Sequence, residues 1–191
     1  MNMKKLLGKL LSVVILLASN TLATEPDPIR ITRLLDVPLA TAWSSWTTMQ
    51  GMQAFFARET IVDPKIDGEY SVHFFPDKPP GSRGAEHMRI VAIEPPNRLM
   101  FTWNSPTFFG PVRDQRSVVE VYLEEIDTAH TQLTLRQFGW GRDGQWPRIR
   151  KYFDGGWRTV LDRLEYSYAH GPVDWDNMPK ELSYDVGPDD L

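Results

Sequence analysis

The 191-residue chain contains no cysteine, which excludes disulfides, thiolate metal ligands and thiol nucleophiles. Its four histidines, His73, His87, His130 and His170, are scattered and do not have the spacing of a paired metal site. The sequence also lacks a phosphate-binding glycine loop, a dinucleotide fingerprint and a nucleophile elbow. We therefore predict no bound metal and no cofactor.

The first 23 residues have a basic start followed by an apolar run. Lys4, Lys5 and Lys9 precede an apolar run over 10–18, and small residues at Thr21 and Ala23 suit a signal peptidase. This pattern predicts a signal peptide at 1–23, cleavage after Ala23, and a periplasmic or secreted protein. An uncleaved anchor is the alternative, but the run is short for a membrane span of about 20 residues. We predict no stable membrane insertion after cleavage.

Loss of residues 1–23 removes three lysines from the 21 basic residues and none of the 25 acidic ones, which leaves a net charge of −7. A protein this acidic is a poor candidate for binding nucleic acid or anionic lipid. Hydrophobic residues make up 41% of the chain and aromatic residues 12%, as in an ordinary globular protein. We expect one domain over 24–170. The sequence leaves the oligomeric state open.

One long amphipathic segment dominates the sequence. Over 146–170, apolar residues recur at spacings of three and four, which predicts one helix with a broad apolar stripe. Pro147 suits its first turn, and Gly171-Pro172 is a stop signal. Gly155 and Gly156 inside it each cost about 1 kcal/mol relative to alanine. Either they mark a kink, or a strand, loop or ligand lies too close to the helix for a side chain.

The rest of the chain reads as strands joined by short turns. We predict strands over 29–36, 59–62, 68–75, 85–94, 98–104, 115–126 and 131–138, and two short helices over 39–48 and up to Phe56. This order predicts an α+β fold in which a curved antiparallel sheet of about 6–7 strands packs on the long helix. The acidic tail at 171–191 has little periodicity, and we expect an arm that is only partly ordered.

Several segments together resemble the START-like (SRPBCC, helix-grip) superfamily, and in particular the domain named for activating the heat-shock-protein ATPase. The most similar stretch is Ile93-Glu94-Pro95-Pro96-Asn97-Arg98-Leu99-Met100-Phe101-Thr102-Trp103, and further similarity lies at 37–43, 52–57, 67–70, 131–135 and 155–164. The resemblance covers residues 29–170. It implies a helix-grip fold with a cavity between the sheet and the last helix, and members that bind lipids, polyketides and other hydrophobic molecules. A minority of members are enzymes, and one branch contacts the chaperone.

Strand alternation suggests which side chains would line such a cavity. His87 and Arg89 share a face with Val91 and Ile93. Ser117 precedes the apolar residues on the same face of its strand, and Gln137 follows those of its own strand. The pattern predicts an apolar base and a polar mouth, although a solvated rim beyond the cavity is the alternative for His87, Arg89 and Gln137. The complete predicted ligand-binding set is His87, Arg89, Phe101, Trp103, Ser117, Gln137, Trp140, Tyr152 and Trp157.

Each member of this set has an expected role. The aromatic residues Phe101, Trp103, Tyr152 and Trp157 are expected to belong to the core or the cavity wall, and not to act as reactive groups. Trp140 lies in a glycine-rich loop over 138–146 that is either a mobile gate or a structural latch, and the segment 104–114 is the opposing lip. Arg89 is a candidate anchor for an anionic head group. A histidine such as His87 could serve as an acid or base, because the intrinsic pKa of imidazole suits proton transfer. A lone histidine is more often structural, however, and we predict no catalytic residue.

Three functions remain open at this stage. The leading one is a non-enzymatic protein outside the cytoplasm that binds a hydrophobic or amphipathic small molecule. The second is an enzyme of the same fold, cyclase-like or hydrolase-like, that acts on such a molecule. The third is a chaperone ATPase co-factor, against which the predicted export argues, because that chaperone needs cytoplasmic ATP.

Overall fold

The computed structural model describes residues 26–142 and 144–191, and the predicted signal peptide at 1–23 lies outside this range. In chain order the elements are the strand β1 (Ile29–Leu35), the helices α1 (Leu39–Thr47) and α2 (Met49–Gln53), the strands β2 (Glu59–Val62), β3 (Tyr70–His73), β4 (Gly84–Ala85), β5 (Ile90–Glu94) and β6 (Arg98–Trp103), the 3₁₀ helix η1 (Thr107–Asp114), the strands β7 (Ser117–Glu125) and β8 (Thr131–Phe138), the long helix α3 (Trp146–His170), and the 3₁₀ helices η2 (Lys180–Leu182) and η3 (Pro188–Asp190).

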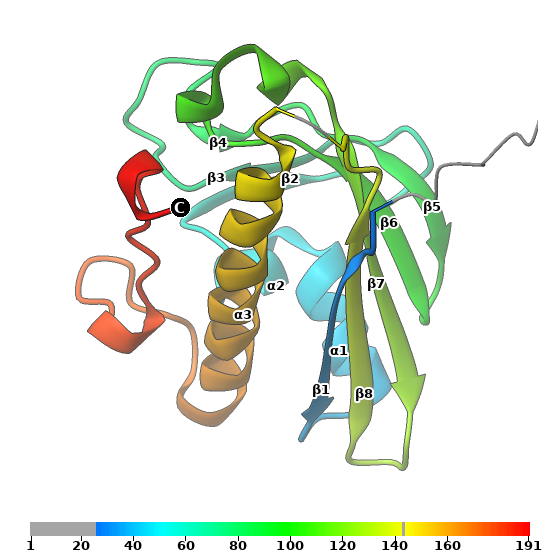
Figure 1. Ribbon diagram of the computed structural model, residues 1–191. Helices are drawn as coiled ribbons and strands as arrows, with labels where there is room; N and C mark the ends of the chain where they lie inside the picture. Colours follow the sequence, from blue (N-terminus) through cyan, green and yellow to red (C-terminus); the bar gives the residue numbers. More distant parts are fainter. Residues whose placement is uncertain (1–25, 143) are drawn as a thin grey trace, which may run out of the picture.

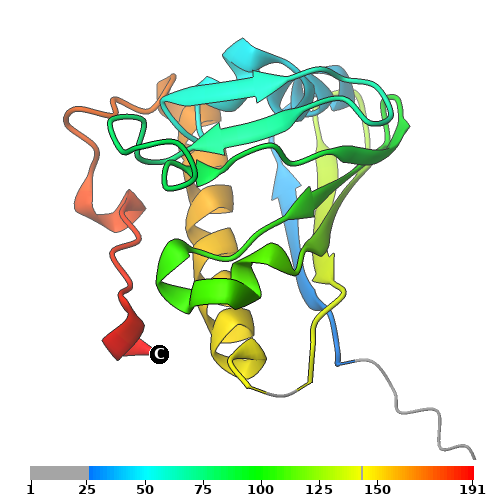
Figure 2. The same cartoon turned by 90° about the horizontal axis from the view of Figure 1, so that it is seen from above.

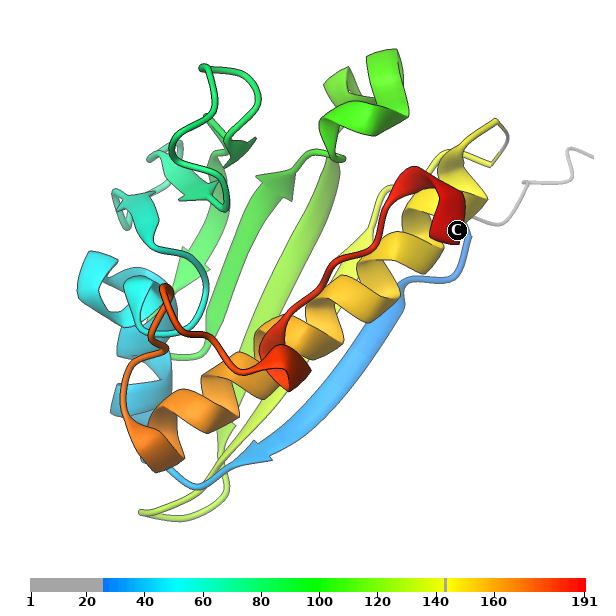
Figure 3. The same ribbon diagram turned by 90° about the vertical axis from the view of Figure 1, so that its left-hand side faces the viewer.

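The strands form an antiparallel sheet of order β1-β8-β7-β6-β5 and a smaller one of order β2-β3-β4. Backbone hydrogen bonds join the two at their edges: the Tyr70 N–H donates to the Met88 carbonyl (2.8 Å) and the Ile90 N–H to the Gly68 carbonyl (3.0 Å). One face of the larger sheet packs on α3, and α1 and α2 lie between the sheet and the end of α3 (Figures 1 and 3). The predicted α+β helix-grip fold is confirmed, with the strands divided between two sheets.

Register places the apolar side chains of neighbouring strands side by side. Leu135 of β8 pairs with Ile31 of β1 and with Val121 of β7. All three side chains are buried. Because side chains alternate across a strand, this register assembles one continuous apolar face from the inward residues of β1, β8, β7 and β6.

Helix α3 covers that face and has the predicted bounds. Its apolar stripe, from Trp146 through Phe153 and Trp157 to Leu164, is buried. The helix begins with proline in its first turn and ends at Gly171, whose φ of 91° suits glycine and whose N–H donates to the Ser167 carbonyl. Most of the stabilisation of a helix like this comes from packing of the stripe, because isolated helices are marginally stable in water.

The tail beyond α3 packs back on the helix. Figure 3 shows it running beside α3, and its Val173 and Leu182 side chains are buried. The buried guanidinium of Arg163 on α3 donates to the Leu182 carbonyl at 2.7 Å. The Trp175 indole N–H donates to the Gln53 carbonyl at 2.9 Å. The tail therefore connects α2 to α3, a docking that the sequence pattern did not predict.

The second explanation for the paired glycines is confirmed. A Cβ at Gly155 would lie 2.6 Å from the Tyr184 hydroxyl oxygen, and a Cβ at Gly156 would lie 3.4 Å from the Tyr184 ring. The tail is thus the segment that lies too close to α3 for a side chain at Gly155, whereas at Gly156 a Cβ would only come into contact with it.

The predicted strand over 85–94 is wrong in its middle. His87 has a φ of 59°, which interrupts the extended backbone between β4 and β5, and the β5–β6 register shifts between Ile90 and Ala92. Such irregularities change the alternation of side chains along a strand. Met88 and Ile90 are consequently buried, whereas Arg89 is exposed and Val91 is largely so. The predicted inward face is therefore wrong at His87, Arg89 and Val91, whereas Ile93, beyond the bulge, is partly buried and packs against the core as predicted.

Candidate functional site

Aromatic rings fill the space between the sheet and α3. Phe101 and Trp103 alternate inward on β6, and Trp103 lies 5.2 Å from the α3 residue Trp157 between ring centroids. Phe56, which follows α2, contacts both tryptophan rings, at 5.7 Å and 5.8 Å. Sequence reasoning placed Phe101, Trp103 and Trp157 here correctly. It assigned no wall position to Phe56, which reaches the interior from a segment distant in sequence.

A chain of polar groups crosses this apolar interior. The Trp157 indole N–H donates to the Gln137 side-chain carbonyl at 2.5 Å, and the Gln137 amide donates to the Ser117 hydroxyl at 2.8 Å. Ser117 in turn donates to the Trp103 backbone carbonyl at 3.3 Å. All of these residues are buried. Because unpaired polar groups inside a protein are costly, this chain satisfies its members and fixes their orientation.

Gln137 is thus an interior residue and does not belong to the solvated rim that was its alternative. Ser117 is the first residue of β7 and Gln137 the penultimate residue of the neighbouring strand β8, and the β7–β8 register brings these two strand ends together. The structure joins them with Trp157, a partner that strand alternation alone could not identify.

Trp140 is a buried part of the loop between β8 and α3. Its indole N–H donates to the Gln137 backbone carbonyl at 3.1 Å, and its ring lies 6.1 Å from both Trp146 and Phe153. These contacts favour the structural latch over the mobile gate.

Tyr152 lies where α3, η1 and the tail meet. Its ring is 5.7 Å from Phe108, 6.0 Å from Phe109 and 5.3 Å from Tyr184. Burial, together with the nearby Tyr184 hydroxyl, raises the pKa of Tyr152 to about 12, so it is a neutral phenol at physiological pH. The segment expected to form a lip does lie against α3, and Tyr152 is the residue it contacts.

Phe74 connects the interior to the surface. It follows β3, its residue is 36% exposed, and its ring contacts Phe56 at 6.0 Å and Trp103 at 6.4 Å. Its neighbour Phe75 is more exposed and lies under the ammonium group of Lys78. Phe74 is therefore a partly exposed ring of the wall itself.

The two remaining predicted residues lie outside the interior. The Arg89 guanidinium is exposed and donates to the Asp67 carbonyl at 3.3 Å. The exposed His87 ring has its Nδ1 3.3 Å from a Glu69 carboxylate oxygen. Their placement on the cavity face is wrong, because the backbone irregularity at His87 and the bulge in β5 reverse which residues point inward.

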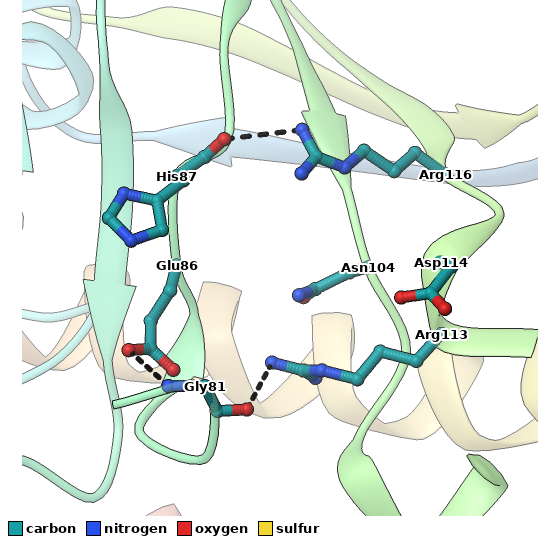
Figure 4. Close-up of a pocket in the computed structure, with 7 residues that line it drawn as sticks. All are labelled: Gly81, Glu86, His87, Asn104, Arg113, Asp114 and Arg116. Atoms are coloured by element: carbon teal, nitrogen blue, oxygen red, sulfur yellow. Dashed lines mark hydrogen bonds between the residues drawn. The ribbon is translucent and has the colours of Figure 1, made fainter. Parts of the chain in front are cut away.

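His87 instead borders a polar pocket of about 400 Å³ between the β4–β5 connection and the η1–β7 segment (Figure 4). The pocket is lined by Gly81, Glu86, His87, Asn104, Arg113, Asp114 and Arg116. Sequence analysis did not single out this group, because its members come from loops and strand ends that carry no periodic pattern.

A second pocket, of about 330 Å³, lies among charged side chains of the larger sheet. There the Glu120 carboxylate pairs with Arg98 at 2.8 Å and with Arg136 at 2.9 Å. This buried carboxylate is neutralised by groups of its own sheet.

Over 26–142 and 144–191, no three or more of His, Asp and Glu are grouped so as to hold a metal ion. Within the same residues, none of the helices has the length and apolar character needed to cross a membrane.

Solved structures with this fold include proteins from three distant organisms. Protein MLL2253 from Mesorhizobium loti is 20% identical, with a TM-score of 0.60, and the match covers 77% of this chain and 100% of that one. An HSP90 activator from Plasmodium falciparum is 18% identical, with a TM-score of 0.60 and coverage of 74% and 96%. CalU16 from Micromonospora echinospora is 22% identical, with a TM-score of 0.55 and coverage of 78% of each chain. At these identities the likeness shows a shared fold.

Comparison with curated proteins finds no match. A family assignment comes instead from the sequence pattern of residues 36–167, which matches the family described as "Activator of Hsp90 ATPase homolog 1-like protein". The match covers more than half of the chain and includes every element from the first short helix to most of α3. The chain therefore belongs to the Activator of Hsp90 ATPase homolog 1-like family of helix-grip (SRPBCC) proteins.

Proposed function

We propose that this protein is exported and binds a hydrophobic or amphipathic small molecule between the larger sheet and α3. The observation that carries the proposal is the aromatic interior crossed by the Ser117–Gln137–Trp157 chain. Ligand sites in proteins are mainly apolar, with a few well-oriented polar groups that select the ligand. An interior of this composition would accept an aromatic or aliphatic body that carries one polar group.

Gln137 is the group best suited to recognise that polar group. A glutamine amide has two N–H donors and a carbonyl with two lone pairs. The Trp157 indole N–H occupies one lone pair of the Gln137 carbonyl, and one Gln137 N–H donates to Ser117. Gln137 therefore keeps one N–H donor and one lone pair beyond its bonds to described side chains. The fixed orientation of its amide would let it recognise a ligand hydroxyl, carbonyl or carboxyl group.

Access to the interior requires a wall ring to move, because the rings contact one another. Phe74 is the ring best placed to do so, since it is partly exposed and contacts Phe56 and Trp103. Side-chain rotation of a partly exposed ring is fast and costs little packing.

The binding test uses the mature protein, starting at Thr24. Native mass spectrometry would detect a co-purified molecule, and titration with 1-naphthol, 1-naphthoic acid and oleate would be followed by tryptophan fluorescence. We expect a co-purified ligand, or saturable one-to-one binding of at least one probe. No co-purified molecule and no saturable binding of any probe would contradict the proposal.

Export has a separate test. When the full-length chain is expressed in a bacterium with a functioning secretion system, we expect the intact mass of the exported protein to correspond to a chain that starts at Thr24. Full-length protein that sediments with membranes would show that the first residues form an anchor instead.

A further inference from the structure

The polar pocket in Figure 4 lies apart from the aromatic interior. Asn104 follows the inward-facing Trp103, and Arg116 precedes the inward-facing Ser117. Asn104 is half-buried and Arg116 exposed, while Trp103 and Ser117 are buried. The residues that line this pocket therefore take no part in the aromatic interior.

Two of the four charged groups that line it hold the surrounding loops together. The Glu86 carboxylate accepts hydrogen bonds from the backbone N–H groups of Gly81 and Arg83, both at 2.9 Å. The Arg113 guanidinium donates to the carbonyls of Ser105 and of Gly84, the latter at 2.7 Å. Glu86 thus connects the β4–β5 segment to the β3–β4 loop, and Arg113 connects η1 to Gly84 of β4, so both side chains are committed to structural roles.

The other polar groups keep unused hydrogen-bonding capacity. Arg116 donates one hydrogen bond, to the His87 carbonyl at 3.2 Å, although a guanidinium has five N–H donors. Asn104 and Asp114 make no side-chain hydrogen bond or ion pair with the residues that the structure describes. Figure 4 shows Asn104, Asp114 and Arg113 extending into the same hollow, which Arg116 borders.

These charges restrict the class of ligand. Arg113 and Arg116 oppose a simple cation, and Glu86 and Asp114 oppose a simple anion, because like charges at short range repel. The uncommitted groups are one guanidinium, one carboxylate and one amide, which complement a ligand that carries both charges. We propose that this pocket binds a small zwitterion of the amino acid class, with its carboxylate toward Arg116 and Asn104 and its ammonium group toward Asp114.

The experiment titrates ¹⁵N-labelled mature protein with L-alanine, L-glutamine and L-phenylalanine. Ethylamine lacks the carboxylate of alanine, and propionate lacks its ammonium group, so they are matched control ligands. We expect at least one amino acid to shift the Asn104 side-chain amide resonance to saturation. Neither single-charge analogue should do so at the same concentration. No shift from any amino acid, or binding of propionate or ethylamine as strong as that of alanine, would overturn the proposal.

Variants test the two charges separately. Arg116→Gln and Asp114→Asn should each raise the dissociation constant of the bound amino acid at least threefold. Arg158→Gln, which removes a charge from the exposed side of α3, should leave it unchanged. Asp114→Asn breaks no bond to a described residue, so it remains informative if Arg116→Gln folds poorly.

Unchanged affinity in both pocket variants would overturn the proposal. Failure here leaves the proposed binding in the interior untouched, because the two sites share no residue.

Discussion

The Tyr184 hydroxyl lies 2.6 Å from the position that a Cβ of Gly155 would occupy, and it donates to the Tyr152 carbonyl at 2.6 Å. Glycine inside a helix costs about 1 kcal/mol relative to alanine. At Gly155 the absence of a side chain permits the contact between α3 and the tail. The family match covers residues 36–167, so Tyr184 lies beyond it, whereas Gly155 and Tyr152 lie within it.

The first prediction concerns Gly155→Ala. In the presence of Tyr184 the new methyl group must displace the tyrosine, so we expect little stabilisation or a net loss. In a Tyr184→Ala background the same change should stabilise the protein by about 1 kcal/mol, the ordinary helix-propensity gain. Urea unfolding of the four proteins in this double-mutant cycle measures the difference.

Gly156→Ala is the internal control, because its Cβ would approach the Tyr184 ring only to 3.4 Å. Its dependence on Tyr184 should be smaller than that of Gly155→Ala. Equal stabilisation by Gly155→Ala with and without Tyr184 would show that the tail does not pack on α3 as described.

The second prediction concerns Trp157. Trp157→Ala should cost about 3–5 kcal/mol, because it removes a large buried side chain. Trp157→Phe keeps most of the packing but leaves the Gln137 carbonyl without its donor, which should cost about 1–3 kcal/mol. Trp175→Phe is the matched control, since its indole is half-buried and water can replace the lost donor. Urea midpoints in which Trp157→Phe costs no more than Trp175→Phe would argue against a buried polar chain.

The third prediction concerns pH. Burial alone would raise the pKa of Glu86, but the N–H groups of Gly81 and Arg83, with the nearby charges of His73 and Arg83, outweigh it and lower the pKa below its ordinary value of 4.5. A lowered folded-state pKa stabilises the protein above the unfolded-state pKa, and this contribution is lost as pH falls through the folded-state pKa.

In Glu86→Gln the carboxylate is replaced by an amide, which does not titrate in this pH range. Between about pH 5 and about pH 3, wild type should therefore lose more stability than Glu86→Gln. Urea unfolding across this range provides the comparison. Parallel loss of stability in the two proteins would show that the Glu86 carboxylate is not held by these N–H groups.

The fourth prediction concerns access to the interior. Phe74→Ala should speed association of a bound probe such as 1-naphthol several-fold, because it removes the partly exposed ring of the wall. Phe75→Ala, a neighbouring change of the same size, should not, since that ring packs with Lys78 at the surface. Stopped-flow fluorescence measures both rates, and equal acceleration by the two variants would exclude Phe74 as the point of access.

The parts of the fold that the sequence predicted are those with strong local patterns. Helix α3 and strand β8 have the predicted bounds, because a long 3.6-residue period and a clear alternation each specify one structure. The walls formed by Phe101, Trp103 and Trp157 follow from the same periodicities.

The features that sequence reasoning missed depend on contacts between distant segments. The left-handed backbone at His87 reverses a strand face, and no local pattern signals it. The docking of Tyr184 on Gly155 joins two segments whose composition indicates only an acidic tail and a costly glycine pair. The hydrogen bond from Trp157 to Gln137 depends on how α3 is rotated over the sheet, which periodicity does not determine.

Binding of a small molecule between the sheet and α3 is the central claim, and the indole N–H resonance of Trp157 tests it most directly. ¹⁵N-labelled mature protein would be titrated with 1-naphthol, 1-naphthoic acid and oleate, or with any molecule that co-purifies. We predict that at least one of them shifts the Trp157 indole and Gln137 amide resonances together to one-to-one saturation, while the Trp175 indole on the tail stays unchanged. Saturable shifts confined to surface residues, with Trp157 and Gln137 unmoved by every molecule, would contradict the claim.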